Sequence, residues 1–256
     1  MSAISVILIT KNEEANIRAC LDSVRWADQI VVVDAGSTDK TLQIARTMTK
    51  SVFVRRWDGF GPAKNFALKK CRGEWVFWID ADERVTEALA SEIRKVVSSK
   101  ELQQAAFSVP RKAFFLGKWI RHSGWYPARV VRVFRKGRGT FTDQKVHERL
   151  MVEGEIGELH SDLLHNTDPT LQHYFEKFNR YTSLGAEELL VEKQRFSMAQ
   201  LLVRPFWTFF RMYVLKAGFL DGLPGFILCI LSSGYVFTKY AKLWELDVNR
   251  QGNHHD

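Results

Sequence analysis

The first hundred residues alternate between short apolar runs and segments whose apolar residues have helical spacing. Runs made almost wholly of apolar residues are typical of strands that are buried on both faces. The alternation therefore predicts an α/β fold in which a parallel sheet is covered by helices on both faces. The predicted strands are residues 4–10, 30–33, 52–54 and 75–79, and the predicted helices are residues 13–24, 39–47, 63–70 and 85–97.

The pattern changes after residue 106, where shorter apolar runs are separated by turn residues. We expect strands at residues 130–134 and 163–165, followed by a break at residues 166–169 that ends in Pro169. From residue 170 onward the spacing of apolar positions is helical. We therefore predict two domains, an α/β domain of residues 1–168 and a helical region of residues 169–256.

The helical region contains two strongly apolar segments. Residues 198–217 are rich in aromatic side chains, and Arg204 and Arg211 are seven residues apart and so share one helical face. Pro205 would kink this helix or mark a new start. Residues 222–238 contain no charged residue, which is at the short limit for a membrane span. Three interpretations remain open: in-plane or re-entrant contact with a membrane, a pair of helices packed in a core, and a spanning helix.

Composition and charge narrow the classes of partner. The chain has 256 residues, 46% of them hydrophobic, and a net charge of +8. Residues 111–149 contain eleven Lys and Arg against only Asp143 and Glu148. Such a stretch suits an anionic partner, although a solvated basic face would have the same composition. The three widely spaced cysteines and the lack of a signal peptide predict a cytoplasmic protein without disulfides.

Polar residues follow the predicted strands at four places. They are residues 10–13, residues 34–38, the segment 59–65 that leads into a helix, and Asp80-Ala81-Asp82. Because the carboxyl ends of parallel strands lie at one edge of a sheet, these residues should line one crevice. Two carboxylates there suit Mg²⁺ or Mn²⁺ beside a diphosphate, whereas the simpler alternative is an acidic turn that caps the next helix.

Three of these stretches carry a family resemblance. The segments SVILITKNE (residues 5–13), VVVDAGSTD (31–39) and WIDAD (78–82) resemble the family 2 glycosyltransferases, which have the GT-A fold, a Rossmann-like mixed sheet. The resemblance implies a UDP-sugar donor and a divalent metal. It places Thr10 and Glu13 beside the base and ribose, Asp34 at the uracil, Lys64 or Asn65 near the diphosphate, Asp80 at the ribose, and Asp82 on the metal ion.

An inverting transfer also needs a carboxylate that takes the proton of the acceptor hydroxyl. We expect Glu148 to be this base, with Asp143 as the second choice. The alternative is that Glu148 simply pairs with a neighbouring arginine. His165 follows a predicted strand and either completes the metal site in this fold or is a core histidine with its hydrogen bonds satisfied.

A closer resemblance extends over most of the chain. The segments VHER (residues 146–149), GFLDG (218–222) and KYAKL (239–243) look like those of bacterial lipopolysaccharide inner-core β-glucosyltransferases. This resemblance implies transfer of glucose from UDP-glucose to a heptose of a lipid A-core acceptor, by an enzyme bound peripherally to the inner face of the cytoplasmic membrane. Another lipid-linked acceptor, such as polyprenyl phosphate, is the alternative. We expect no nucleic-acid partner, because four acids at one edge would repel a polynucleotide.

Overall fold

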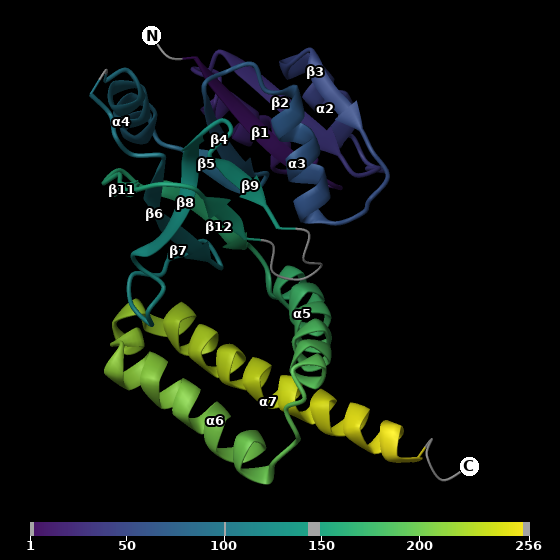
Figure 1. Cartoon of the computed structure of the whole chain (residues 1–256). Coiled ribbons are helices and arrows are strands. Elements are labelled where there is room, and N and C mark those ends of the chain that lie inside the picture. The colour runs from purple at the N-terminus through teal and green to yellow at the C-terminus, as the bar shows by residue number, and fades with distance from the viewer. Residues whose placement is uncertain (1–2, 100, 143–148, 253–256) are drawn as a thin grey trace. The chain divides into compact units, whose positions relative to one another are not determined.

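The computed structural model describes residues 3–99, 101–142 and 149–252, and its main feature is a mixed β-sheet (Figure 1). The strands of this sheet follow the order β3-β2-β1-β4-β8-β6-β12-β5, with β7 and β11 pairing to β6. The strands are β1 (Ile4–Thr10), β2 (Gln29–Asp34), β3 (Ser51–Val54), β4 (Trp75–Asp80), β5 (Glu83–Val85), β6 (Ala106–Phe115), β7 (Lys118–Trp119), β8 (Ala128–Arg135), β11 (Ile156–Glu158) and β12 (Leu163–Asp168). A separate antiparallel pair is formed by β9 (Gly139–Phe141) and β10 (Leu150–Val152).

The first four strands are all parallel, as the alternating pattern predicts. The sheet becomes mixed at β8, which runs antiparallel to β4 and to β6. The helices of this part are α1 (Ile17–Ser23), α2 (Thr41–Met48), α3 (Phe60–Lys70) and α4 (Glu87–Val97). They cover both faces of the sheet, because alternate residues of β1 enter different cores. Val6 and Leu8 pack with α1 and α4, whereas Ile7 packs with α3.

The helix predicted to begin at residue 85 begins two residues later, because residues 83–85 pair with another strand. Glu83 lies opposite His165 in the antiparallel pair of β5 and β12. Thr86 then caps α4, since its side-chain oxygen accepts a hydrogen bond from the backbone N–H of Leu89. The short strand before the helix therefore brings residues 83–85 alongside β12.

The C-terminal region is helical, as predicted, and consists of α5 (Leu171–Val191), α6 (Met198–Phe210) and α7 (Gly222–Gly252). In Figure 1, α6 and α7 run beside each other, and α5 packs against α7. Helix α6 continues through Pro205, whose carbonyl accepts a hydrogen bond of 2.8 Å from the hydroxyl of Ser233 on α7. Within the described residues, one helical stretch, Gly218–Arg250, is long and apolar enough to cross a membrane, with a mean hydropathy of 1.5.

The chain forms two compact units whose limits differ from the predicted domains. One unit contains Met1–Lys112 and Ala128–His165, and the other contains Ala113–Pro127 and Asn166–Asp256. The division between residues 165 and 166 falls within β12, close to the predicted boundary at residue 168, and residues 166–168 continue this strand where the sequence predicted a break. The segment 113–127 joins the helical unit because Phe115 and Ile120 are buried among residues of α7 such as Leu228. Such a long-range contact leaves no signal in local periodicity.

Candidate active site

The carboxyl ends of β1, β2 and β4 form the edge at which the predicted site residues meet. Their parallel register places Thr10 opposite Asp34 and Ile9 opposite Asp80. Thr10 is buried, and its hydroxyl oxygen has no hydrogen-bond partner anywhere in the described part of the chain. A buried hydroxyl without a partner is costly, so this position can accept a polar ligand atom.

Asp34 organises the turn that follows β2. Its carboxylate accepts hydrogen bonds from the backbone N–H of Gly36 at 3.0 Å and of Ser37 at 2.9 Å, and also from the Ser37 hydroxyl. Gly36 has a φ of +84°, which glycine adopts without strain. Asn12 then ties the loop after β1 to this turn, because its side-chain oxygen accepts from the Thr38 N–H at 2.8 Å. The two loops are thus fixed to each other before any ligand binds.

Glu13 lies in the same braced pair of loops. Its backbone N–H donates to the hydroxyl of Thr41 at 2.7 Å, and its carboxylate accepts from the side-chain amide of Asn16 at 2.9 Å. The structure therefore brings Thr10, Glu13 and Asp34 to one edge of the sheet, where the sequence placed them.

The acids after β4 surround a buried arginine from β8. The Arg132 side chain is 1% exposed and donates through Nη2 to Asp80 at 2.8 Å and to Glu83. Its guanidinium also stacks on the Trp78 ring, with Cζ 3.5 Å from the ring centroid. Burial alone would raise the pKa of Asp80, but Arg132, helped by Lys64, lowers it to about 2. Asp80 is therefore held ionised at neutral pH.

Glu83 differs from Asp80 because it is wholly buried. Burial raises the pKa of Glu83, and the neighbouring Asp80 charge adds to the effect, while Arg132 opposes it. Its carboxylate also accepts a hydrogen bond from the Asp80 backbone N–H at 3.1 Å. Glu83 thus connects the backbone of the acidic turn to the buried guanidinium.

Asp82 and His165 lie beside each other, with 3.2 Å between Asp82 Oδ2 and His165 Nε2. The pairing of β5 with β12 produces this contact, because His165 is the register partner of Glu83. The two side chains are 18% and 12% exposed, so a small ligand can reach them. Among residues 3–99, 101–142 and 149–252, no group of three or more His, Cys, Asp or Glu side chains is arranged to hold a metal ion.

Lys64 on α3 is buried against aromatic rings. Its ammonium nitrogen lies 3.9 Å from the centroid of Trp78, 5.3 Å from Phe141 and 5.6 Å from Phe60. Cation–π attraction stabilises a charge in such a cage. The same ammonium contributes to the low pKa of Asp80, so Lys64 lies close to the acidic edge.

Asn65, the next residue, has a structural contact. Its side chain donates to the Phe141 carbonyl at 2.8 Å and accepts from the Phe141 N–H at 3.0 Å, as a neighbouring strand would. Asn65 thus fixes the end of β9 to α3. The two predicted base residues, Asp143 and Glu148, lie outside the described residues.

Arg132 and Glu83 are parts of the site that the sequence did not predict. A signal for Arg132 was present, because a charged residue interrupts the otherwise apolar run of residues 130–134. A buried arginine requires carboxylate partners, and the acidic turn at residues 80–83 is the richest source of them in this unit. Its pairing with this turn depends on the antiparallel contact between β4 and β8, which residue patterns do not reveal.

The comparisons with known proteins agree with this geometry. Residues 5–151 match the family described as glycosyl transferase family 2. The chain belongs to glycosyltransferase family 2. It is 30% identical over 249 residues to the lipopolysaccharide core biosynthesis glycosyltransferase LpsC of Rhizobium meliloti, covering 94% of this chain and 92% of that protein. It is 29% identical to an uncharacterised glycosyltransferase of Rickettsia typhi, covering 97% of this chain and 89% of that protein.

A solved structure supports the fold of this family 2 glycosyltransferase. A mannosyltransferase from Pyrobaculum calidifontis, in complex with GDP-mannose and Mn²⁺, superposes with a TM-score of 0.57. The match covers 95% of this chain and 87% of the other at 16% sequence identity. The predicted GT-A fold is confirmed.

Proposed function

We propose that this glycosyltransferase is an inverting, metal-dependent enzyme that transfers glucose from UDP-glucose to a heptose of the lipopolysaccharide inner core. The observation that carries the proposal is the group of Asp80, Asp82 and His165 at the edge where β1, β2 and β4 end. Family membership supports sugar transfer, and this edge is where open α/β sheets bind their ligands.

The residues at this edge fit a divalent metal ion. Mg²⁺ and related ions are commonly held by one or two carboxylates while substrate phosphates and water complete the coordination. Asp82 offers the carboxylate, and the adjacent His165 offers a ring nitrogen 3.2 Å from it. When bound, the ion would offset the negative charge that develops on the leaving diphosphate. Its presence in the structure of the Pyrobaculum mannosyltransferase is consistent with this assignment.

The chain's own residues have distinct roles in binding the donor. Asp34 would accept from the uracil through Oδ2, which keeps a lone pair beside its bond from the Ser37 hydroxyl, whereas Oδ1 already accepts from two backbone N–H groups. Thr10 and Glu13 would lie beside the base and ribose, and Asp80 would accept from the ribose hydroxyls. Arg132 keeps Asp80 ionised for that purpose. Lys64 supplies positive charge near the diphosphate, whereas the contacts of Asn65 favour a role in holding β9.

Glu148 is our proposed general base, with Asp143 as the alternative. In an inverting transfer the base takes the acceptor proton as the acceptor oxygen attacks the anomeric carbon, and the diphosphate leaves from the opposite face. Both residues belong to the sequence between β9 and β10 and lie outside the described residues.

The acceptor and the membrane location rest on two further observations. The relative from Rhizobium meliloti carries a name in lipopolysaccharide core biosynthesis. Helices α6 and α7 expose many large apolar side chains, among them Phe206 (71% exposed) and Leu223 (69% exposed). We propose that these helices lie peripherally on the inner face of the cytoplasmic membrane, where they would bring the enzyme to a lipid A-core acceptor. The exposed lysines and arginines of the basic stretch would bind the phosphates of a phosphorylated acceptor.

The test is a matrix of donors and acceptors whose products are weighed by mass spectrometry. UDP-glucose with a heptose-terminated lipid A-core acceptor should give a product heavier by one hexose. Product with polyprenyl phosphate alone would favour the alternative acceptor. Transfer from GDP-mannose but from no UDP-sugar would overturn the donor assignment.

Two substitutions test the residue roles in the same assay. Asp82→Ala should abolish transfer while leaving the unfolding transition close to that of the wild type, because Asp82 is at the ligand-facing edge. Glu148→Gln should lower turnover strongly with UDP-glucose binding retained. Normal turnover of Asp82→Ala after removal of divalent ions would refute the metal assignment, and unchanged turnover of Glu148→Gln would move the base to Asp143.

A further inference from the structure

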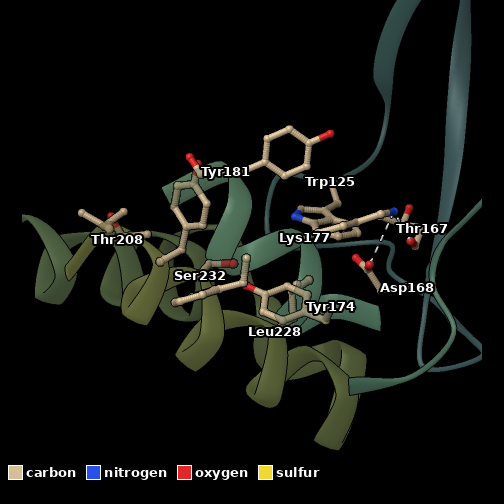
Figure 2. Close-up of a pocket in the computed structure, with 12 residues that line it drawn as sticks. Trp125, Thr167, Asp168, Tyr174, Lys177, Tyr181, Thr208, Leu228 and Ser232 are labelled. Atoms are coloured by element: carbon tan, nitrogen blue, oxygen red, sulfur yellow. Dashed lines mark hydrogen bonds and ion pairs between the residues drawn. The ribbon is translucent and has the colours of Figure 1, made fainter. Parts of the chain in front are cut away.

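The helical unit contains an elongated groove that the proposed transfer reaction does not use. Its volume is about 380 Å³, within the range of small-molecule sites. Trp125, Thr167 and Asp168 lie at one end of the view in Figure 2, and Thr208 lies at the other. The groove is lined by Trp125, Thr167, Asp168, Tyr174, Lys177, Phe178, Tyr181, Thr208, Leu228, Ser232, Tyr235 and Val236.

Two helices form the long walls of the groove. Tyr174, Phe178 and Tyr181 form a stripe on α5, and Leu228, Ser232 and Tyr235 form a facing stripe on α7. Seven residues of helix correspond to a length of about 10 Å. The walls are therefore aromatic and aliphatic along two turns of each helix, with ring centroids of Phe178 and Tyr235 5.8 Å apart.

Three polar side chains of the groove, those of Thr208, Tyr235 and Lys177, are bonded to the protein itself. The Thr208 hydroxyl donates to the Arg204 carbonyl at 2.8 Å, and the Tyr235 hydroxyl donates to the Tyr181 carbonyl at 3.1 Å. Lys177 donates to the Thr167 carbonyl at 2.9 Å and lies 3.6 Å from the Asp168 carboxylate. A sugar would need several hydrogen-bond partners, and these groups are already engaged. A hydrocarbon chain needs none, so the chemistry of the walls favours it.

Two cations near the Thr208 end of the groove indicate that the hydrocarbon chain carries an anionic group. Lys239 lies one turn beyond Tyr235 on α7, and Arg204 lies one turn before Thr208 on α6. Their charged groups are 5.3 and 5.2 Å from the ring of Tyr240. Burial, and then the charge of Arg204, lower the pKa of Lys239, and two glutamates, Glu188 and Glu192, offset part of this effect. An anionic group beside Lys239 would relieve the repulsion between the two cations.

The exposed surface of the same unit connects the groove to a source of such molecules. Phe175 on α5 is 48% exposed and its ring contacts those of Tyr174 and Phe178 in the groove wall. Tyr181 lines the groove and is itself 40% exposed. The apolar lining therefore continues onto apolar surface, and exposed apolar surface on this scale is characteristic of membrane contact.

We propose that the groove between α5 and α7 binds one acyl chain of an anionic membrane phospholipid, with the lipid phosphate beside Lys239 and Arg204. Such a lipid would contact both α5 and α7. The proposal rests on the membrane contact in the proposed function and not on the donor or the acceptor.

The test measures lipid retention by the full-length protein in the absence of any sugar donor. Protein in a mild detergent is incubated with phosphatidylglycerol or phosphatidylcholine and weighed by native mass spectrometry. Ser232→Phe places a ring in the groove, and the matched control Ile230→Phe adds the same ring to α7 at a side chain that is 47% exposed. Circular dichroism and the unfolding midpoint establish that both variants are folded.

We expect the wild type and Ile230→Phe to retain one phosphatidylglycerol, and Ser232→Phe to bind it at least about tenfold more weakly. Lys239→Gln should still retain lipid but lose the preference for phosphatidylglycerol over phosphatidylcholine. If Ser232→Phe misfolds, quenching of the Trp125 fluorescence by lipid is measured instead. Lipids with brominated chains should quench the wild type more than Trp125→Phe.

The proposal is overturned if the wild type retains no lipid, or if Ser232→Phe retains as much as Ile230→Phe. Equal quenching of the wild type and Trp125→Phe by brominated lipids would also overturn the proposal. Retention of lipid by a protein that transfers no sugar would leave this inference standing while the proposed function failed. Sugar transfer by a protein that retains no lipid would support the proposed function and overturn this inference.

Discussion

Arg132 is the residue on which the acidic edge depends. It is buried with Glu83 and also bonded to Asp80, while its Nε and Nη1 atoms have no hydrogen-bond partner in the residues that the structure describes. A buried charge is tolerated only with compensating partners, and the two carboxylates provide them. The buried guanidinium thus fixes Asp80 at the edge where the donor is proposed to bind.

Removal of the guanidinium should destabilise the fold strongly. Arg132→Met leaves Glu83 buried without its cation, and we expect a loss of about 3–5 kcal/mol in the free energy of unfolding. The double variant with Glu83→Gln should lose less than the sum of the single variants, because both remove the same interaction. Denaturant unfolding measures all three. Arg25→Met is the control, since Arg25 and Asp22 are exposed and their pair should contribute under about 1 kcal/mol. If the loss in the double variant equalled the sum of the two single losses, Arg132 and Glu83 would not be coupled.

The low pKa of Asp80 makes the free energy of unfolding depend on pH in the acidic range. The pKa of Asp80 is lowered from an ordinary 3.8 to about 2, so its contribution is complete above 3.8 and is lost as the pH falls toward 2. The raised pKa of Glu83 acts in the opposite sense, and its penalty disappears as the carboxyl is protonated. We expect Asp80→Asn to lose less stability than the wild type over the same fall in pH, as measured by urea unfolding. Parallel pH profiles would rule out this linkage.

Sequence reasoning located one side of this cluster but not the other. Asp80, Asp82 and His165 were identifiable because the two acids follow one predicted strand and the histidine ends another. The cation was not, because Arg132 reaches the acids only through the pairing of β4 with β8 some fifty residues away. Side chains that depend on strand order are the part of a site that periodicity cannot supply.

At the scale of elements, side chains replace missing backbone partners at several joints. Asn65 of α3 pairs with both backbone groups of Phe141, which is 2% exposed, and so extends the ladder of β9. The strands and helices of the first hundred residues were predictable, because buried parallel strands give unbroken apolar runs. The contact between Asn65 and Phe141 was not predictable, because the family resemblance places Lys64 or Asn65 near the diphosphate.

Loss of the Asn65 side chain should loosen the end of β9. Asn65→Ala leaves the N–H and carbonyl of Phe141 buried without these partners, and we expect a loss of about 1–3 kcal/mol. The amide of Phe141 should exchange with deuterium faster, as mass spectrometry of peptides covering β9 would detect. Asn249→Ala on the exposed end of α7 is the control and should change neither quantity. Unchanged exchange at Phe141 in Asn65→Ala would show that this joint is not needed.

At the scale of the molecule, the two units present different surfaces. The unit with the sheet buries its apolar side chains in cores on both faces of the sheet. The helical unit exposes them instead, including Leu202, Phe206 and Trp207 on α6. The aromatic pattern of residues 198–217 left membrane contact, a core-packed pair and a span open, and it did not indicate that the segment 113–127 would belong to the same unit. Pairing of distant segments again lies beyond local patterns.

The exposed face of α6 gives the last prediction, which separates in-plane contact from a core-packed pair. The double variant Phe206→Asp with Trp207→Asp should bind phosphatidylglycerol vesicles in a flotation assay at least about tenfold more weakly than the wild type. The reason is that two apolar side chains no longer enter the lipid. Its unfolding midpoint should hardly change, since these side chains are 71% and 51% exposed. Val191→Asp, at an apolar side chain that is 81% exposed on α5, is the control and should float like the wild type. Alkaline carbonate should release the wild type if the helices lie in the interface. Retention after carbonate would instead indicate a span by α7, and equal flotation of all variants would exclude α6 as the membrane surface.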